Sequence, residues 1–226
     1  MNNTVRLKKC IITSLLAGMS VVLYVIGPKF KLPFFPSFLT INFSMVPIFV
    51  GIIVLGAQYG ASIVGIRFII GLMSGSSTAG IGETADLIIG LCLVLFTWIG
   101  KLLFNNKAKY VPMFLFAILG WIIGGLLSNS FALPMYVNVL NAKGWVVSSM
   151  HSIISDANES NYVMYYFLCA VLPFNALLSF IVVGITYLLY LPLHKYTDNL
   201  FDKTIKSKET VLIDDGKTDD IYKDLH

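Results

Sequence analysis

Charged residues are scarce in this chain. They make up 12% of its 226 residues, whereas hydrophobic residues make up 57%. A soluble domain contains about 25% charged residues, so the composition excludes an ordinary soluble domain and predicts an integral membrane protein. Acidic residues are especially few in the first part, because only four of the 12 precede position 198. We therefore predict a membrane domain over 1–195 and a polar cytoplasmic tail, without an apolar period, over 196–226.

The motifs of common enzyme classes are also missing. The three cysteines, Cys10, Cys92 and Cys169, lie far apart, with no spacing that would bind a metal. The sequence contains no P-loop pattern, so any ATP would be hydrolysed by another chain, and it contains no HExxH or Ser/His/Asp arrangement. Neither a cofactor nor nucleic-acid binding is predicted. Only Glu83 and Asp86 would offer an acid–base pair to a membrane-embedded enzyme.

Apolar runs are what the sequence has in abundance. A membrane-spanning helix requires about 20 apolar residues, and six runs are candidates: 10–27, 45–56, 59–74, 83–103, 110–129 and 162–193. The predicted fold class is therefore an all-α membrane protein with six transmembrane helices. The second and third runs are short and are expected to form a hairpin partly shielded by protein. The absence of an internal repeat argues against a transporter built from inverted halves.

Two long loops separate these spans, at 28–44 and 141–161. The first contains three prolines and is expected to be structured or strand-like, and the second is expected to be a polar loop. Basic residues indicate which side the loops face, because cytoplasmic loops are enriched in Lys and Arg. With a cytoplasmic N-terminus, only Lys29, Lys31 and Lys143 fall outside. Both termini are therefore predicted to be cytoplasmic in the cell membrane.

Three charged residues lie at membrane depth: Arg67, Glu83 and Asp86. Charges in such places need a partner or a cavity. In a structural interpretation, Arg67 pairs with one carboxylate, and Glu83 stands at a helix start near the positive end of its dipole. In a functional interpretation, the turn in GSSTAGIGETADLIIG (75–90) is the rim of a ligand pocket. Asp86 would then orient Arg67 or bind ligand hydroxyls, and Thr78 would add a hydrogen-bonding group.

Two asparagines beside prolines form a second polar set. Asn175 follows Pro173 in LPFN, and Asn129 precedes Pro134 in SNSFALPMY. A proline in a helix removes an amide donor and frees a carbonyl, so one interpretation is that the asparagines brace kinked helices. The other is that they line a pocket near the outer face, together with Tyr136. The candidate aromatic walls of this pocket are Phe43, Trp121 and Phe174.

Small residues in the first predicted span offer a place for a partner. Ser14 and Gly18 form a small-xxx-small pair next to Ala17, and such pairs allow another helix to approach closely. They lie near the cytoplasmic end of the span. The sequence therefore predicts that a partner subunit docks there.

Together, these segments resemble the S component, the substrate-binding subunit, of energy-coupling factor (ECF) vitamin transporters, in the riboflavin and pantothenate branch. The resemblance covers about 8–195, where five segments occur in the family's order and spacing. They are FLTINFSMVPIFVGIIVLG (38–56), Gly65-Ile66-Arg67, SSTAGIGETADLIIG, SNSFALPMY and VLPFNALL. It implies six helices and a vitamin pocket that opens outward, capped by the loop between the first two helices.

The resemblance also implies partners. These are a transmembrane coupling protein and two cytoplasmic ATPase subunits, so ATP hydrolysis is not expected of this chain. The family's first helix docks on the coupling protein through an AxxxA motif, and here Ser14 and Gly18 occupy its places. In the family's model, the S component topples in the membrane and carries its vitamin inward. The candidate ligand-binding residues are Asn42, Arg67, Thr78, Glu83, Asp86, Asn129, Tyr136 and Asn175.

Pantothenate is predicted as the ligand ahead of riboflavin. Some riboflavin-specific relatives carry a lysine three residues after the asparagine of LPFN, where this chain has Leu178. Many also have a Pro-Met-Asn type sequence where this chain has 82–86. In addition, Arg67 would pair with a carboxylate ligand such as pantothenate.

Three other classes remain as alternatives. A stand-alone channel or secondary transporter would take up its solute with an ion gradient and without ATP. A membrane-embedded enzyme would be active without ATPase partners. A structural subunit would bind no small molecule.

Overall fold

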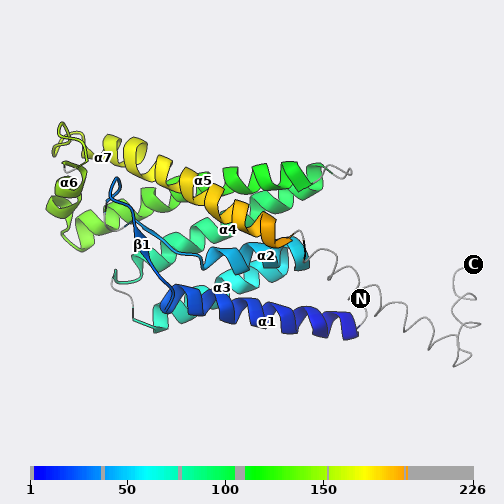
Figure 1. The fold of residues 1–226 in the computed structure, drawn as a ribbon. Coiled ribbons are helices and arrows are strands. Elements are labelled where there is room, and N and C mark those ends of the chain that lie inside the picture. Colours follow the sequence, from blue (N-terminus) through cyan, green and yellow to red (C-terminus); the bar gives the residue numbers. More distant parts are fainter. Residues whose placement is uncertain are drawn as a thin grey trace, which may run out of the picture.

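The computed structural model describes residues 3–36, 39–75, 78–104, 110–151, 153–190 and 192. Its helices form an elongated bundle, crossed near one end by a two-stranded hairpin (Figure 1). The predicted tail over 196–226 lies outside the described residues. In order, the elements are α1 (Asn3–Val25), β1 (Phe30–Lys31), β2 (Thr40–Ile41), α2 (Met45–Leu55), α3 (Ala57–Met73), α4 (Ile81–Leu103), α5 (Tyr110–Pro134), η1 (Met135–Val139), α6 (Lys143–His151), α7 (Tyr162–Tyr165) and η2 (Tyr166–Val171). A last helix continues over 172–190.

Four helices of the described chain are long and apolar enough to cross a membrane: Asn3–Val25, Ile81–Leu103, Val111–Val139 and Tyr162–Tyr190. They correspond to the first, fourth, fifth and sixth predicted spans, with the first helix starting earlier than expected. The second and third predicted spans are helices of 11 and 17 residues. The prediction that these two are short is therefore confirmed. The described residues thus form a mostly helical protein, as expected of a helical membrane protein.

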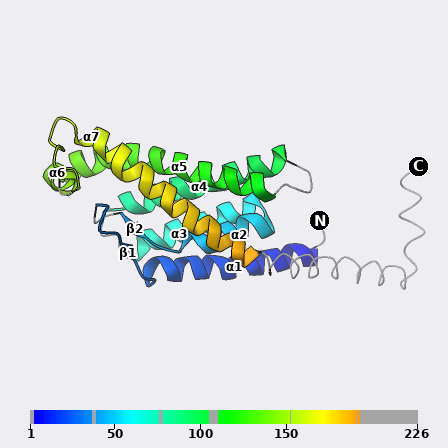
Figure 2. The same ribbon diagram turned by 45° about the horizontal axis from the view of Figure 1, so that its top comes forward.

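The short helix α2 forms the centre of the bundle. Ten of its 11 residues are buried, and Figure 2 shows it between α1 and the last helix. A helix that is apolar on all sides is stable only when protein surrounds it. Its Ile48 and Phe49 are fully buried in the main core. This packing is the shielding that the sequence predicted for the short hairpin.

The long helices α4 and α5 lie against each other with glycines at the contact. An added Cβ at Gly120 would lie 2.6 Å from the Cβ of Phe96 and 2.9 Å from the carbonyl oxygen of Cys92. At Gly124 it would lie 3.0 Å from the Cα of Ile89. Small residues at helix contacts in membranes allow the backbones to approach in this way. The pair therefore forms one rigid wall of the bundle.

The loop predicted over 28–44 contains a short antiparallel hairpin, in which Phe30 pairs with Ile41 and Lys31 with Thr40. The strand-like expectation is confirmed. Phe30 also lies edge-on to Phe43, with ring centroids 6.1 Å apart. The hairpin thereby brings the polypeptide back over the end of the bundle before α2 begins.

The loop predicted over 141–161 is not simply polar and irregular, because it contains helix α6. Val146 and Met150 lie one turn apart on α6, and both are buried in a second cluster with Leu133, Tyr166 and Val171. This i, i+4 apolar pair is sufficient to dock a short helix. Lys143, the first residue of α6, forms an exposed ion pair of 2.8 Å with Glu159, which follows the helix.

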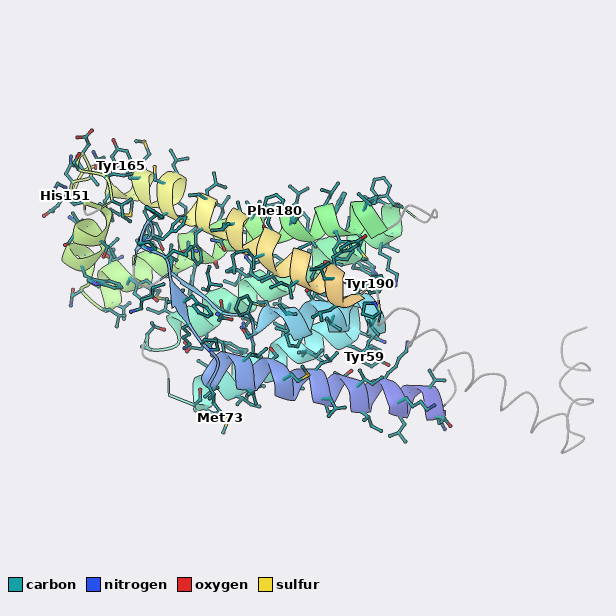
Figure 3. The ribbon with its side chains drawn as sticks, viewed as in Figure 1. Tyr59, Met73, His151, Tyr165, Phe180 and Tyr190 are labelled. Carbon is teal, nitrogen blue, oxygen red and sulfur yellow. The ribbon has the colours of Figure 1, made fainter. Side chains whose placement is uncertain are left out.

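The two ends of the bundle differ in what they carry. Figure 3 places His151 and Tyr165 at the end with α6, and Tyr59 and Tyr190 at the opposite end. The start of α1 also lies at the latter end (Figure 1). Along the sides, apolar side chains such as Phe180, which is 62% exposed, project outward. An apolar girdle between two different ends is what a membrane protein requires.

Candidate ligand-binding site

A cavity of about 470 Å³ lies at the α6 end of the bundle, between the hairpin, α1, α4, α5 and the last helix. This volume is within the range of about 300–1,000 Å³ that is typical of small-molecule sites. Seven of the eight predicted ligand-binding residues line it: Asn42, Thr78, Glu83, Asp86, Asn129, Tyr136 and Asn175. The fold therefore brings together positions that are up to 133 residues apart, from Asn42 to Asn175.

Arg67, the eighth predicted residue, is not among the described residues that line the cavity. It is 2% exposed, and its Nη1 lies 3.2 Å from Oδ2 of Asp86. The same nitrogen donates to Oγ of Ser44 at 2.9 Å, and the guanidinium lies over the ring of Tyr24, 4.9 Å from its centroid. The predicted pairing of Arg67 with a carboxylate is confirmed, and Arg67 acts on the cavity through Asp86.

The Arg67 contact also orients Asn42. Ser44 Oγ accepts from Arg67 and donates to Oδ1 of Asn42. The backbone carbonyl of Ser44 accepts a hydrogen bond of 2.7 Å from Ser20 of α1. A hydrogen-bonded chain thus runs from α1 through the start of α2 to α3 and α4. Such a connected network restricts the positions of its members.

Glu83 lies in the first turn of α4, as predicted, and is 8% exposed. Tyr24 donates to its Oε1 at 3.2 Å, and Thr78 donates to its Oε2 at 3.4 Å. The α4 amide of Gly82 donates to Thr78 Oγ1 at 3.1 Å. Gly80, with φ +86°, allows the tight turn that precedes the helix. The carboxylate is therefore held at the rim by α1 and by the turn.

The two asparagines brace their own helices and also line the cavity. Asn129 Nδ2 donates to the carbonyl of Gly125 at 2.8 Å, and Asn175 Nδ2 donates to that of Val171 at 2.9 Å. Tyr166 donates to Oδ1 of Asn129 at 2.6 Å. The structure therefore agrees with both interpretations of the asparagines, as braces of their helices and as residues that line a pocket. Wide π-helical turns lie directly after Pro134 and shortly before Pro173, where the α-helical pattern is interrupted.

Six aromatic side chains line the same cavity: Tyr24, Trp121, Tyr136, Trp145, Tyr166 and Phe174. Trp121 and Phe174 were expected from the sequence, whereas Phe43 is not among the described lining residues. Sequence reasoning missed Tyr24, Lys29, Trp145 and Tyr166. Tyr24 and Lys29 flank the Gly27-Pro28 helix stop, and a polar-tipped aromatic at the end of a span would have been a usable signal.

A second recess of about 560 Å³ lies elsewhere, between the α2–α3 turn and the α4 and α5 ends that meet at the opposite end of the bundle. Its walls include Leu55, Trp98 and Lys101, and no carboxylate or asparagine of the described chain lines it. The smaller cavity is the better ligand site, because several polar groups converge on an apolar wall there. Among the residues described, no group of three His, Cys, Asp or Glu residues is placed to hold a metal ion.

Comparison with known proteins identifies the class. The family model of the ECF transporter, substrate-specific component, matches residues 8–190. The chain therefore belongs to this family of membrane transport proteins.

Two relatives are similar over most of their length. The "Riboflavin transporter FmnP" of Bacillus subtilis (strain 168) is 26% identical over 196 residues, which cover 85% of this chain and 95% of that protein. A solved structure described as "Structure and mechanism of the S component of a bacterial ECF transporter" matches with a TM-score of 0.61 and 22% identity. It covers 84% of this chain and 98% of the other. At that identity the match shows that the two chains share the S-component fold.

Proposed function

We propose that this chain is a riboflavin-binding S component, which takes the vitamin into the 470 Å³ cavity from outside the cell. The observation that carries the proposal is the lining of the cavity. Six aromatic side chains surround it, and two carboxylates and three asparagine side chains converge on it. Aromatic faces stack on a planar ring, carboxylates accept hydrogen bonds from hydroxyl groups, and amides both donate to them and accept from them. Riboflavin combines a flat tricyclic ring with a polyhydroxylated chain.

Pantothenate fits this cavity less well than the sequence suggested. The argument for it depended on Arg67 being available to a carboxylate ligand. Arg67 is instead paired with Asp86 and bonded to Ser44. Pantothenate has no ring to stack on the aromatic walls, so the site favours the neutral flavin. The name of the Bacillus subtilis relative supports the same choice.

Calorimetric titration of the purified, detergent-solubilised protein tests the ligand. Riboflavin is expected to bind tightly with one-to-one stoichiometry, and its fluorescence is expected to be quenched by the aromatic walls. Pantothenate, titrated under the same conditions, is expected to give no binding heat. A one-to-one signal with pantothenate instead of riboflavin would overturn the assignment. No signal with either vitamin would overturn it as well, since S components are expected to bind without their partners.

The partners of the proposed transporter are a transmembrane coupling protein and two ATPase subunits. Support comes from the face of α1 that other helices leave open. Ser14 and Gly18 are exposed, and a Cβ added to Gly18 would meet nothing within 4 Å. Ala17 does not belong to this face, because it is 3% exposed and packs in the core. Docking through Ser14 and Gly18 is thus part of the proposal, and a contact through Ala17 is not.

The proposal includes six membrane crossings with both termini in the cytoplasm. In it, α2 and α3 are the two short crossings, of which α2 is enclosed by the surrounding helices and α3 leaves one face exposed. The distribution of Lys and Arg puts the start of α1 inside, and the cavity at the α6 end then opens outside. This arrangement suits uptake of a vitamin from the medium.

A further inference from the structure

We propose that the indole N–H of Trp121 donates a hydrogen bond to an acceptor atom on the ring of the bound ligand. The inference deepens the proposed function, because it assumes that the cavity takes a heterocyclic vitamin. It makes Trp121 a specificity-determining residue. It also fixes which end of the ligand enters the cavity first.

Trp121 carries a donor that has no partner in the part of the chain that the structure describes. The side chain lines the cavity and is 2% exposed. Its Nε1 atom is fully buried and has no hydrogen-bond partner among the described residues. Leaving a buried donor unsatisfied is unfavourable, and such groups are rare in folded proteins. A ligand in the cavity would supply the missing acceptor.

The position of Trp121 separates it from the other polar groups of the site. It precedes Asn129 by eight residues on α5, which corresponds to about 12 Å along a helix axis. Ile89 and Leu178 also line the cavity, each about one turn deeper than Asp86 and Asn175 on their helices. The deep end is therefore lined by apolar side chains, and the indole N–H is buried beside it. The carboxylates lie nearer the rim.

The division of the cavity into an apolar deep end and a polar rim indicates which part of a ligand binds in each. An apolar, aromatic floor favours a flat conjugated ring over a hydroxylated chain. A lone N–H donor there requires an acceptor on that ring, either a carbonyl oxygen or an unprotonated ring nitrogen. The isoalloxazine ring of riboflavin carries both kinds. The ring therefore enters first, and the hydroxylated chain lies at Glu83 and Asp86.

Replacement of Trp121 by 3-benzothienylalanine tests the inference, because sulfur replaces only the N–H and the ring keeps its shape. One hydrogen bond between neutral groups corresponds to about 2- to 12-fold in affinity. We expect riboflavin to bind weaker by about that factor. The matched control places the same analogue at Trp98, which lies on α4 outside the ligand cavity. That variant is expected to bind riboflavin as the wild type does.

Thermal unfolding of the ligand-free proteins separates ligand binding from a structural role. If the N–H has no partner in the empty protein, its removal should leave the melting temperature unchanged or raise it. A lowered melting temperature of the ligand-free Trp121 analogue would overturn the inference. Riboflavin affinity within twofold of wild type would overturn it too. The proposed function fails on a different result, namely the absence of riboflavin binding by the wild-type protein.

Discussion

At the scale of single residues, the site depends on a carboxylate that faces two ways. Asp86 lines the cavity with a side chain that is 25% exposed, and on its other side it neutralises Arg67. The apolar run around the two residues predicted that their charges would need partners. The sequence could not predict that Arg67 would be enclosed, because this depends on Ser44 and Tyr24, which come from other parts of the chain.

Substitution Asp86→Asn is expected to destabilise the protein. It leaves the Arg67 cation buried without its carboxylate, and breaking a buried pair in this way costs about 3 kcal/mol. Denaturant unfolding in detergent would measure the loss. Arg67→Met combined with Asp86→Asn should be less destabilised than Asp86→Asn alone, since it removes the unpaired cation. Equal stability of Asp86→Asn and wild type would show that the pair does not hold the fold.

At the scale of elements, most helices follow from runs of apolar residues, but their ends and contacts do not. The predicted 45–56 and 59–74 became α2 and α3 almost unchanged, since a glycine separates two apolar runs. In contrast, α6 was missed, because its two buried residues, Val146 and Met150, stand in an otherwise polar stretch. The asparagines and carboxylates that line the cavity could be predicted from the sequence. Its aromatic members Tyr24, Trp145 and Tyr166 were not, because only the packing of helices brings them to one place.

Helix α5 and the last helix approach each other so closely at Gly125 that no side chain fits there without displacing a neighbour. An added Cβ there would lie 2.6 Å from Oδ1 and 2.7 Å from Nδ2 of Asn175. Gly125→Ala is therefore expected to displace Asn175, which would lower riboflavin affinity at least tenfold and destabilise the fold by about 1–3 kcal/mol. Titration and thermal unfolding would measure the two effects.

The matched control for Gly125→Ala is Gly184→Ala on the last helix. A Cβ at Gly184 would meet nothing within 4 Å, so alanine should be neutral or stabilising by up to about 1 kcal/mol. If both variants behaved alike, the close approach of α5 to Asn175 would not be the cause of the effect at Gly125.

At the scale of the whole molecule, the cavity and the exposed α1 face are connected by the protein itself. Ser20 and Tyr24 of α1 reach the cavity network through Ser44 and Glu83. Ser14, at the middle of the same helix, and Gly18, two residues before Ser20, are exposed, whereas Ser20 is buried. The proposed ligand site and the proposed docking face thus involve different faces of one helix.

The proposed orientation predicts which ends of the bundle are accessible outside the cell. In a variant without native cysteines, a single cysteine at Ser155 should react with a membrane-impermeant maleimide on intact cells. A cysteine at Asn3 should react only after the cells are permeabilised. Both positions are exposed in the structure and lie at opposite ends of the bundle. The reverse pattern of labelling would place the cavity on the cytoplasmic side.

Substitution Gly18→Leu separates binding from transport. A Cβ at Gly18 would meet nothing within 4 Å, so the new side chain is expected to fill the open α1 face, and riboflavin affinity of the purified variant should equal that of wild type. Uptake in cells that supply the ATPase and coupling subunits should fall at least tenfold, because a leucine prevents close approach of the partner helix. Gly184→Leu adds the same bulk on the last helix, at a position equally open, and should transport normally.

If instead wild type and Gly18→Leu took up riboflavin equally in vesicles with an ion gradient and no ATP, the chain would be a stand-alone secondary transporter. The α1 face would then contact lipid alone.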